Sequence, residues 1–328
     1  LYRKHPEEAR DSFGEDPFEV KNILKYWVFS EKPEFHVIPT DTINIHIDKD
    51  ALLRSGIMLP KTIRHLKGED LKDAIPDKLY IPLTDIRMLT KVDLLMLEML
   101  ANCNWERPLY LAISVGSVSK LKFDNYFVQE GLAFRFTPFD YKKWGDVGEN
   151  RLYAVDVERL YDNVMNRYKY GGLDTPGLYL DETTLRTCWY HRRLFAQLAK
   201  ELIAQGDNER AKKVLAYAEQ VIPGYNVPET HESGSYDIAT AYAALGEKTK
   251  AVTLAVHLIA EAEDYINWAF SLKGNRIEMV RNDCIYKFWQ WNQYNELLKK
   301  IDGEKYKESN RRFEEKYALF APTMNYKN

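Results

Sequence analysis

The spacing of hydrophobic residues changes about halfway along the chain, from short strand-like stretches to long helical periodicity. In the first half, residues 42–47, 78–83 and 132–136 are typical of half-buried strands. The continuous apolar run at 109–115 predicts a further, buried strand. Helical patterns separate these strands. We therefore expect an α/β or α+β module with a small mixed sheet under helical cover.

Two helix starts in this half carry capping residues. Asp16 precedes Pro17 and an apolar helical pattern, which predicts a helix capped by Asp16 with proline at its first position. Thr90 and Asp93 form a capping box. The helix after Thr90, over residues 91–101, is apolar almost all round, so we expect it to be covered on most sides.

A polar, glycine-containing loop at 140–151 marks a soft boundary. After it, Asp156 caps a helix whose apolar residues follow helical spacing from Val157 to Tyr168, and two glycines then end this helix. The expected organisation is an α/β module over 1–150, a connecting helix and turn over 151–180, and an all-α domain over 181–328.

The all-α domain contains an internal repeat. Large residues precede Gly206, and small residues such as Ala211 follow it; the same order recurs around Gly246 and Ala251. The two alanines are forty residues apart, which places an insertion of about six residues near 225–230. Bulky first helices and small contact residues are typical of tetratricopeptide-like hairpins. A hairpin cannot bury its apolar face alone, so we expect residues 277–301 to form a third layer and the last helix to cap it.

Composition narrows the function. The formal net charge of −3, with lysines and arginines interspersed among acids, argues against nucleic-acid binding. The three cysteines are far apart and surrounded by apolar residues, so we expect buried thiols and neither a metal site nor a cofactor. The longest apolar stretches are too short to span a bilayer. A start at Leu1 in polar sequence predicts a soluble piece of a larger protein.

No nucleophile–base motif, phosphate loop or metalloprotease motif is present in the sequence, so we assign no catalytic residue. Four polar clusters are candidate binding sites, because amide, carboxylate and guanidinium groups together suit hydroxyl-rich ligands. Each cluster has a simpler interpretation as a polar surface or a helix cap. The candidates are Asp162, Asn163, Asn166 and Arg167 on one helix face, Asp181 and Glu182 at a helix start, Asn104 and Arg107 at a helix–strand junction, and Gln129 and Glu130 beside a strand.

Two histidines are weaker candidates for a functional role. Glu229, His231 and Glu232 lie together in the insertion and could bind a metal, although a solvated loop is the preferred interpretation. His191 precedes Arg192 and Arg193, whose charges would disfavour its protonated form, and we expect a structural role.

Four ordered motifs carry a resemblance to a known family. They are the segments 104–110 with 115–117, 124–127 with 129–133, 161–166 with 170–172, and 179–183. The chain resembles the soluble carboxyl-terminal half of large bacterial membrane proteins that contain a domain of unknown function and are similar to protein O-mannosyltransferases. The resemblance implies a parent that transfers a sugar from a lipid-linked donor, with this part in the periplasm and the catalytic acid in the membrane half.

The leading hypothesis is a non-catalytic region that packs beside the membrane-embedded half and holds a polypeptide acceptor or partner on its helical repeats. A glycan is a further candidate partner. One alternative is a freestanding scaffold for protein–protein interaction. Another is an independent enzyme with a site between the two halves, built from Asp162, Arg167, Asp181 and Glu182.

Overall fold

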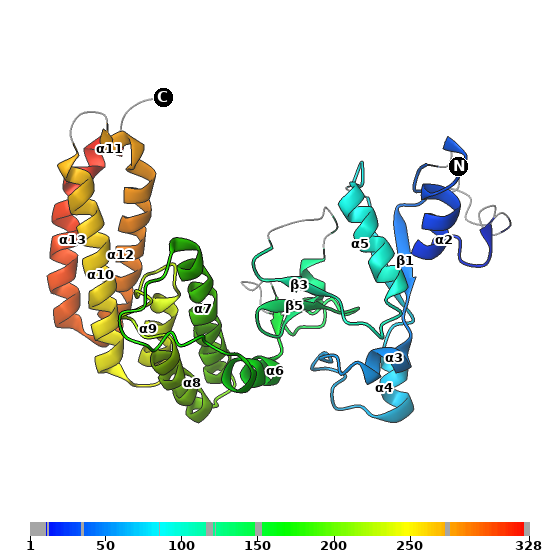
Figure 1. Ribbon diagram of the computed structural model, residues 1–328, viewed down its shortest axis with the longest axis horizontal. Helices are drawn as coiled ribbons and strands as arrows, with labels where there is room; N and C mark the ends of the chain where they lie inside the picture. Colours follow the sequence, from blue (N-terminus) through cyan, green and yellow to red (C-terminus); the bar gives the residue numbers. More distant parts are fainter. Residues whose placement is uncertain are drawn as a thin grey trace. The chain divides into compact units, whose positions relative to one another are not determined.

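The computed structural model describes residues 11, 13–33, 36–84, 86–115, 121, 123–147, 153–272 and 276–324. The chain divides into two compact units, Leu1–Asp156 and Val157–Asn328 (Figure 1). The first unit contains small sheets with helices, and the described elements of the second are all helical apart from loops. The predicted fold class is therefore confirmed.

The first unit contains two small sheets where the sequence predicted one. Strands β1 (Thr42–His46) and β2 (Lys78–Pro82) pair antiparallel. The second sheet has the order β3-β5-β4-β6, antiparallel except for the β4–β6 pair. Its strands are β3 (Tyr110–Ala112), β4 (Phe127–Gln129), β5 (Ala133–Phe136) and β6 (Ala154–Val155). The prediction of a buried strand at 109–115 is wrong in one respect, because β3 lies at the sheet edge with Tyr110 exposed.

The described helices of this unit are α2 (Val20–Ile23), continued by the π-helix η1 (Leu24–Val28), α3 (Lys49–Arg54), α4 (Gly68–Ala74), α5 (Lys91–Asn102) and the 3-10 turn η3 (Asp124–Tyr126). Helix α2 contacts α5 and β1 around a common apolar core. The predicted Asp16 cap is wrong: Glu19 is the N-cap residue. The Asp16 carboxylate accepts from Lys78 Nζ (2.6 Å) and Asn44 Nδ2 (3.1 Å), so it is bound to the first sheet instead.

Helix α5 begins with the predicted capping box between Thr90 and Asp93. Its cover differs from the expectation. Leu97 and Leu100 are buried, whereas Val92, Leu95 and Met99 are 47%, 57% and 50% exposed. The spacing of three and four residues places these three side chains on one outward face, so α5 is covered on one side only.

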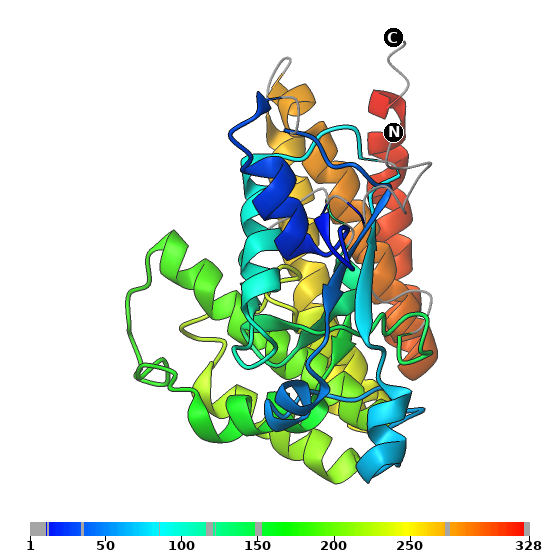
Figure 2. The ribbon, with the colours of Figure 1, turned by 90° about the vertical axis from the view of Figure 1, so that its right-hand side faces the viewer.

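The second unit begins with α6 (Val157–Asp162), which continues into the π-helix η4 (Asn163–Arg167). The helices that follow are α7 (Glu182–Ala204), α8 (Asn208–Val221), α9 (Ser235–Ala244), α10 (Lys248–Ser271), α11 (Arg276–Met279), α12 (Arg281–Ile301) and α13 (Gly303–Met324). Helix α7 contacts α8 and α9, α10 contacts α9 and α12, and α12 contacts α13. Helices α10, α12 and α13 run side by side in both views (Figures 1 and 2).

The repeat prediction is confirmed at its small residues. Ala211 and Ala251 are fully buried, where α8 meets α7 and α10 meets α9. Gly206 and Gly246 follow the first helix of each hairpin with φ of +81° and +79°, the left-handed conformation that ends helices with glycine. The third layer also forms, although Ile285 and Trp289 within it are exposed.

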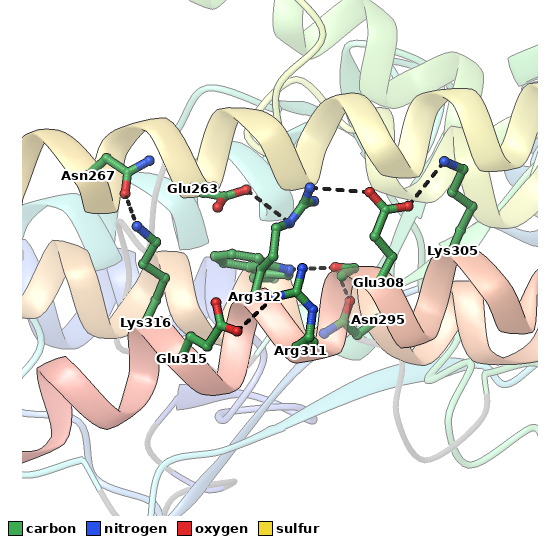
Figure 3. A network of polar contacts seen from close by, with 11 residues as sticks. Glu263, Asn267, Asn295, Lys305, Glu308, Arg311, Arg312, Glu315 and Lys316 are labelled. Atoms are coloured by element: carbon green, nitrogen blue, oxygen red, sulfur yellow. Dashed lines mark hydrogen bonds and ion pairs between the residues drawn. The ribbon is translucent and has the colours of Figure 1, made fainter.

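Helix α13 is held on α12 and α10 by polar contacts (Figure 3). Trp291 Nε1 donates to Ser309 Oγ at 2.8 Å, and Ser309 Oγ donates to Asn295 Oδ1 at 2.6 Å; all three residues are buried. Closer to the surface, Arg312 pairs with Glu263 and Glu308. These directional contacts fix the register of α13. The helix serves as the predicted cap, and its own residue Phe320 is buried.

The three cysteines are buried free thiols, as expected. Within the described residues, no helix combines the length and the apolar character that crossing a membrane requires.

Candidate functional site

The junction residues predicted in the first unit mainly support its fold. Asn104 has a φ of +47° and accepts a hydrogen bond from Lys21 Nζ at 3.0 Å. Arg107 is exposed and shares with Arg135 the lining of a cavity of about 10 Å³. Such a volume holds about one water molecule. This cavity is therefore too small to hold an organic ligand.

Gln129 and Glu130 are buried rather than presented to a ligand. The Glu130 carboxylate accepts from the Tyr110 hydroxyl at 2.8 Å and lies 3.6 Å from Arg135 Nη1. Arg135 in turn donates to the Ser55 carbonyl at 3.0 Å. This buried ion pair ties strand β5 to the end of α3. Arg107 and Glu130 thus both lie beside Arg135, in a structural cluster.

The polar helix face predicted in the second unit forms on α6 and η4. Asn166 Nδ2 donates to Asp162 Oδ1 at 3.0 Å, and Arg167 Nε lies 2.6 Å from Asp162 Oδ2. The hydrogen bond from Asn166 lowers the pKa of the Asp162 carboxyl, assisted by the charge of Arg167. Asn163 belongs to the same π-helical turn. The four residues share one exposed to half-buried surface.

Asp181 and Glu182 act within their own helix. The Asp181 carboxylate caps α7 by accepting from the backbone amides of Thr183 and Thr184. The Thr184 contacts lower its pKa. Glu182 pairs with Arg186 one turn later. Among the described residues, no hydrogen bond or ion pair joins these two acids to Asp162 or Arg167.

An aromatic cluster on the first helices of the hairpins is a stronger candidate. Helices α7, α9 and α12 begin the successive layers, and α9 contacts both of the others. The cluster includes Tyr236 on α9, and Tyr286 and Trp289 on α12. The loop before α9 adds His231. Helical repeats bind ligands on extended surfaces of this kind.

The rings in this cluster hold one another in place. His231 stacks on Tyr236 with centroids 5.8 Å apart, and its Nδ1 is 2.9 Å from the Tyr294 hydroxyl. Its ring also meets the edge of Trp289 at 5.6 Å. Tyr286 and Trp289 are nearly parallel, 5.6 Å apart, and 46% and 49% exposed. The cluster is therefore half-buried at His231, buried at Tyr294, and open to solvent at Tyr286 and Trp289.

The surroundings of the cluster are acidic. Burial lowers the pKa of His231, opposed by the nearby charges of Glu232 and Asp237, so the imidazole is neutral at pH 7. Burial raises the pKa of Tyr236, and the charges of Asp237 and Glu296 raise it further. Lys287 is paired with Glu261 at 3.1 Å. A neutral imidazole and protonated tyrosines leave the acids to set the local charge.

Sequence reasoning missed this site. It predicted residues 277–301 only as a third helical layer, and it gave the loop of Glu229, His231 and Glu232 as a weak metal candidate. In the structure, His231 contacts Tyr294 and Glu232 accepts from Gln290 Nε2 at 3.0 Å. Over the described ranges, no three histidine, cysteine or acidic side chains gather to hold a metal ion. The available signal was the spacing of Tyr286, Trp289 and Gln293, which forms a second stripe on α12.

Comparison with known proteins bears on the first unit. The curated proteins and the solved structures gave no match to the chain. Residues 5–158 match the family model described as TMEM260-associated domain 2, and this segment ends where the second unit begins. The first unit is thus similar to a domain associated with TMEM260.

Proposed function

We propose that this chain is a non-catalytic binding region of a larger membrane protein that resembles glycosyltransferases of the protein O-mannosyltransferase type. The first unit associates with the membrane-embedded half, and the second unit binds a polypeptide, either the acceptor or a partner protein. The match of residues 5–158 to TMEM260-associated domain 2 supports an association of the first unit with a TMEM260-like protein. In this proposal the region lies on the periplasmic face of the inner membrane.

The observation that carries the polypeptide proposal is the exposure of Tyr286 and Trp289 as a nearly parallel pair of rings on α12. These rings are oriented by contacts with His231 and with each other. Ordered aromatic side chains lose little conformational entropy when a ligand covers them, and tyrosine and tryptophan are enriched among the residues that dominate binding energy. The two rings therefore form a prepared contact surface.

The charges around the rings indicate which polypeptide fits. Glu232, Asp237, Glu261 and Glu296 lie close enough to affect the titration of His231, Tyr236 or Tyr294. A lysine or arginine of the ligand can contact the face of Trp289 while these acids attract it. We therefore propose an extended segment that combines an apolar residue with a basic one.

A display experiment tests this function. Random peptides of about twelve residues, displayed on phage, are selected on the full chain, and the affinities of selected peptides are measured by calorimetry. We expect selected sequences to be enriched in basic residues. Trp289→Ala lowers their affinity by at least about tenfold, as for a residue that dominates binding.

The matched control is Trp268→Ala, because Trp268 on α10 is also 49% exposed but has no contact with the ring cluster among the described interactions. Its affinity for the selected peptides stays within about twofold of the parent. Selection of no peptide, or equal losses in the two variants, would refute the proposed site.

A further inference from the structure

A cavity in the helical unit lies beside the π-helical turn η4. It has a volume of about 460 Å³ and is lined by residues of η4, the loop after it, and α8. Pockets for small molecules are about 300–1,000 Å³. The cavity is thus large enough for a small organic ligand, and it shares no lining residue with the aromatic cluster on α9 and α12.

Polar groups in this cavity lack partners in the protein. Among the described residues, the Lys169 ammonium, the Asp174 carboxylate and the Tyr217 hydroxyl make no hydrogen bond or ion pair, and all three residues line the cavity. The side-chain amide of Asn166 donates through Nδ2 to Asp162, and its Oδ1 remains available to a ligand. A ligand here meets donors and acceptors together.

Aromatic rings form the walls of the same cavity. Tyr217 is fixed edge-on against Tyr170, with centroids 6.0 Å apart, and Tyr168 is fixed edge-on against His191 at 5.8 Å. The Tyr170 hydroxyl is already used, since it donates to the Val164 carbonyl at 2.6 Å. These rings offer apolar faces to the C–H groups of a ligand, beside the polar groups of Asn166 and Lys169.

The net charge of the cavity lining favours a neutral ligand over a strongly ionised one. One ammonium and one carboxylate, from Lys169 and Asp174, leave the lining without net charge. A neutral ligand with many hydroxyl groups can donate to Asp174 and to the Asn166 carbonyl oxygen, and accept from Lys169 and Tyr217. We propose that this cavity is a binding site for a short neutral saccharide.

The proposal is tested with the full chain and a panel of neutral trisaccharides: maltotriose, cellotriose, mannotriose and chitotriose. Binding is measured by saturation-transfer NMR and calorimetry, up to about 10 mM ligand. We expect at least one trisaccharide to bind. Asn166→Ala and Lys169→Ala should each weaken it by about fivefold or more, since each removes a contact to the ligand.

Two control variants test whether the loss of binding is specific to this cavity. Lys213→Ala changes an exposed lysine on α8 that does not line the cavity, and Trp289→Ala changes the proposed polypeptide face. Both should bind the trisaccharide within about twofold of the parent. The result is therefore independent of the polypeptide proposal.

Several outcomes would overturn the saccharide site. Absence of binding by all four trisaccharides would do so, as would equal binding by the parent and the Asn166→Ala and Lys169→Ala variants. Binding of a selected peptide that is lost in Lys169→Ala and kept in Trp289→Ala would also do so, because the cavity would then hold a polypeptide. Far-UV circular dichroism of each variant confirms that the helices remain.

Discussion

Arg192 Nη2 donates a hydrogen bond to the carbonyl oxygen of Val227 at 2.6 Å, across 35 residues of sequence. The same buried guanidinium donates to the carbonyl oxygens of Ile222 and Pro228 and to Ser233 Oγ. Helix α7 thereby holds the loop inserted between the two helical hairpins. Burial lowers the pKa of Arg192 to about 10, so the side chain remains charged at neutral pH.

Replacing this arginine should destabilise the second unit. Arg192→Met leaves three loop carbonyl oxygens without their donor, and each unsatisfied buried group costs about 1–3 kcal/mol. We expect a loss of at least about 2 kcal/mol in the free energy of unfolding, measured by urea denaturation. Arg193→Met is the matched control, because Arg193 is exposed; its effect should stay within about 0.5 kcal/mol. Equal effects of both variants would contradict the assigned role.

The cap helix α13 gives a second stability prediction. Ser309→Ala leaves two buried groups without a hydrogen-bond partner, the indole N–H of Trp291 and the side-chain Oδ1 of Asn295. The expected loss is about 1–3 kcal/mol in the free energy of unfolding, followed by tryptophan fluorescence. Ser271→Ala, at an exposed position that ends α10, should change it by less than about 0.5 kcal/mol. A stable Ser309→Ala variant would show that another group satisfies Trp291.

The features predicted correctly from sequence are those that depend on neighbouring residues. Glycine at 206 and 246 and alanine at 211 and 251 specify a helix end and a close helix contact within one hairpin. The capping box at Thr90 depends on residues three positions apart. These features depend on residues close together in sequence and not on tertiary packing, so they can be predicted from the sequence.

The errors involve partners distant in sequence. Asp16 was predicted to cap its own helix because nothing local indicated that Lys78 would bind its carboxylate. Helix α5 has the same apolar composition whether one side or every side is covered, so the exposure of Leu95 could not be predicted from it. Likewise, Glu130 was predicted to lie in a polar cluster because nothing local indicated that Tyr110, 20 residues earlier, would donate to its buried carboxylate.

The candidate sites divide in the same way. The contact between Asp162 and Asn166 follows from a spacing of four residues on a helix, and sequence reasoning placed both on one face. The ring cluster joins His231 to Trp289 and Tyr294, which lie 58 and 63 residues further along the chain. Its existence depends on how α9 packs on α12, which residue spacing alone does not specify.

Backbone strain gives a third prediction, at the end of α7. Gly206 has φ of +81°, and an added Cβ would meet no atom within 4 Å, so any cost of Gly206→Ala comes from the left-handed conformation alone. That conformation costs about 1–2 kcal/mol for a residue with a side chain. We expect the free energy of unfolding in urea to fall by about 1 kcal/mol.

The matched control is Gly303→Ala, at the first residue of α13. Its φ is not in the left-handed region, and the added Cβ also meets no atom within 4 Å. Because alanine restricts the unfolded chain and favours helix, this variant should be unchanged or more stable by up to about 1 kcal/mol. Equal losses in the two variants would indicate that φ is not the cause.

The last prediction concerns pH. His191 is half-buried and packs edge-on against the rings of Tyr168 and Tyr170, and this partial burial lowers its pKa from the usual 6.5. The cause differs from the predicted repulsion by neighbouring arginines, since Arg192 points its charge at loop carbonyl oxygens. In the window between the lowered pKa and 6.5, the unfolded chain binds a proton at His191 that the folded chain does not bind.

The free energy of unfolding therefore rises with pH through this window. The contribution of His191 is fully present above about pH 6.5 and is lost as the pH falls below it. His191→Phe keeps a ring against Tyr168 and Tyr170 but cannot bind the proton. Thermal unfolding at pH 7.5 and pH 5 measures the difference. The parent should lose more stability on acidification than the variant, since carboxylates contribute equally to both. An identical loss in the two proteins would mean that His191 is protonated without cost in the folded state, and its partial burial against the tyrosines would then carry no pH dependence.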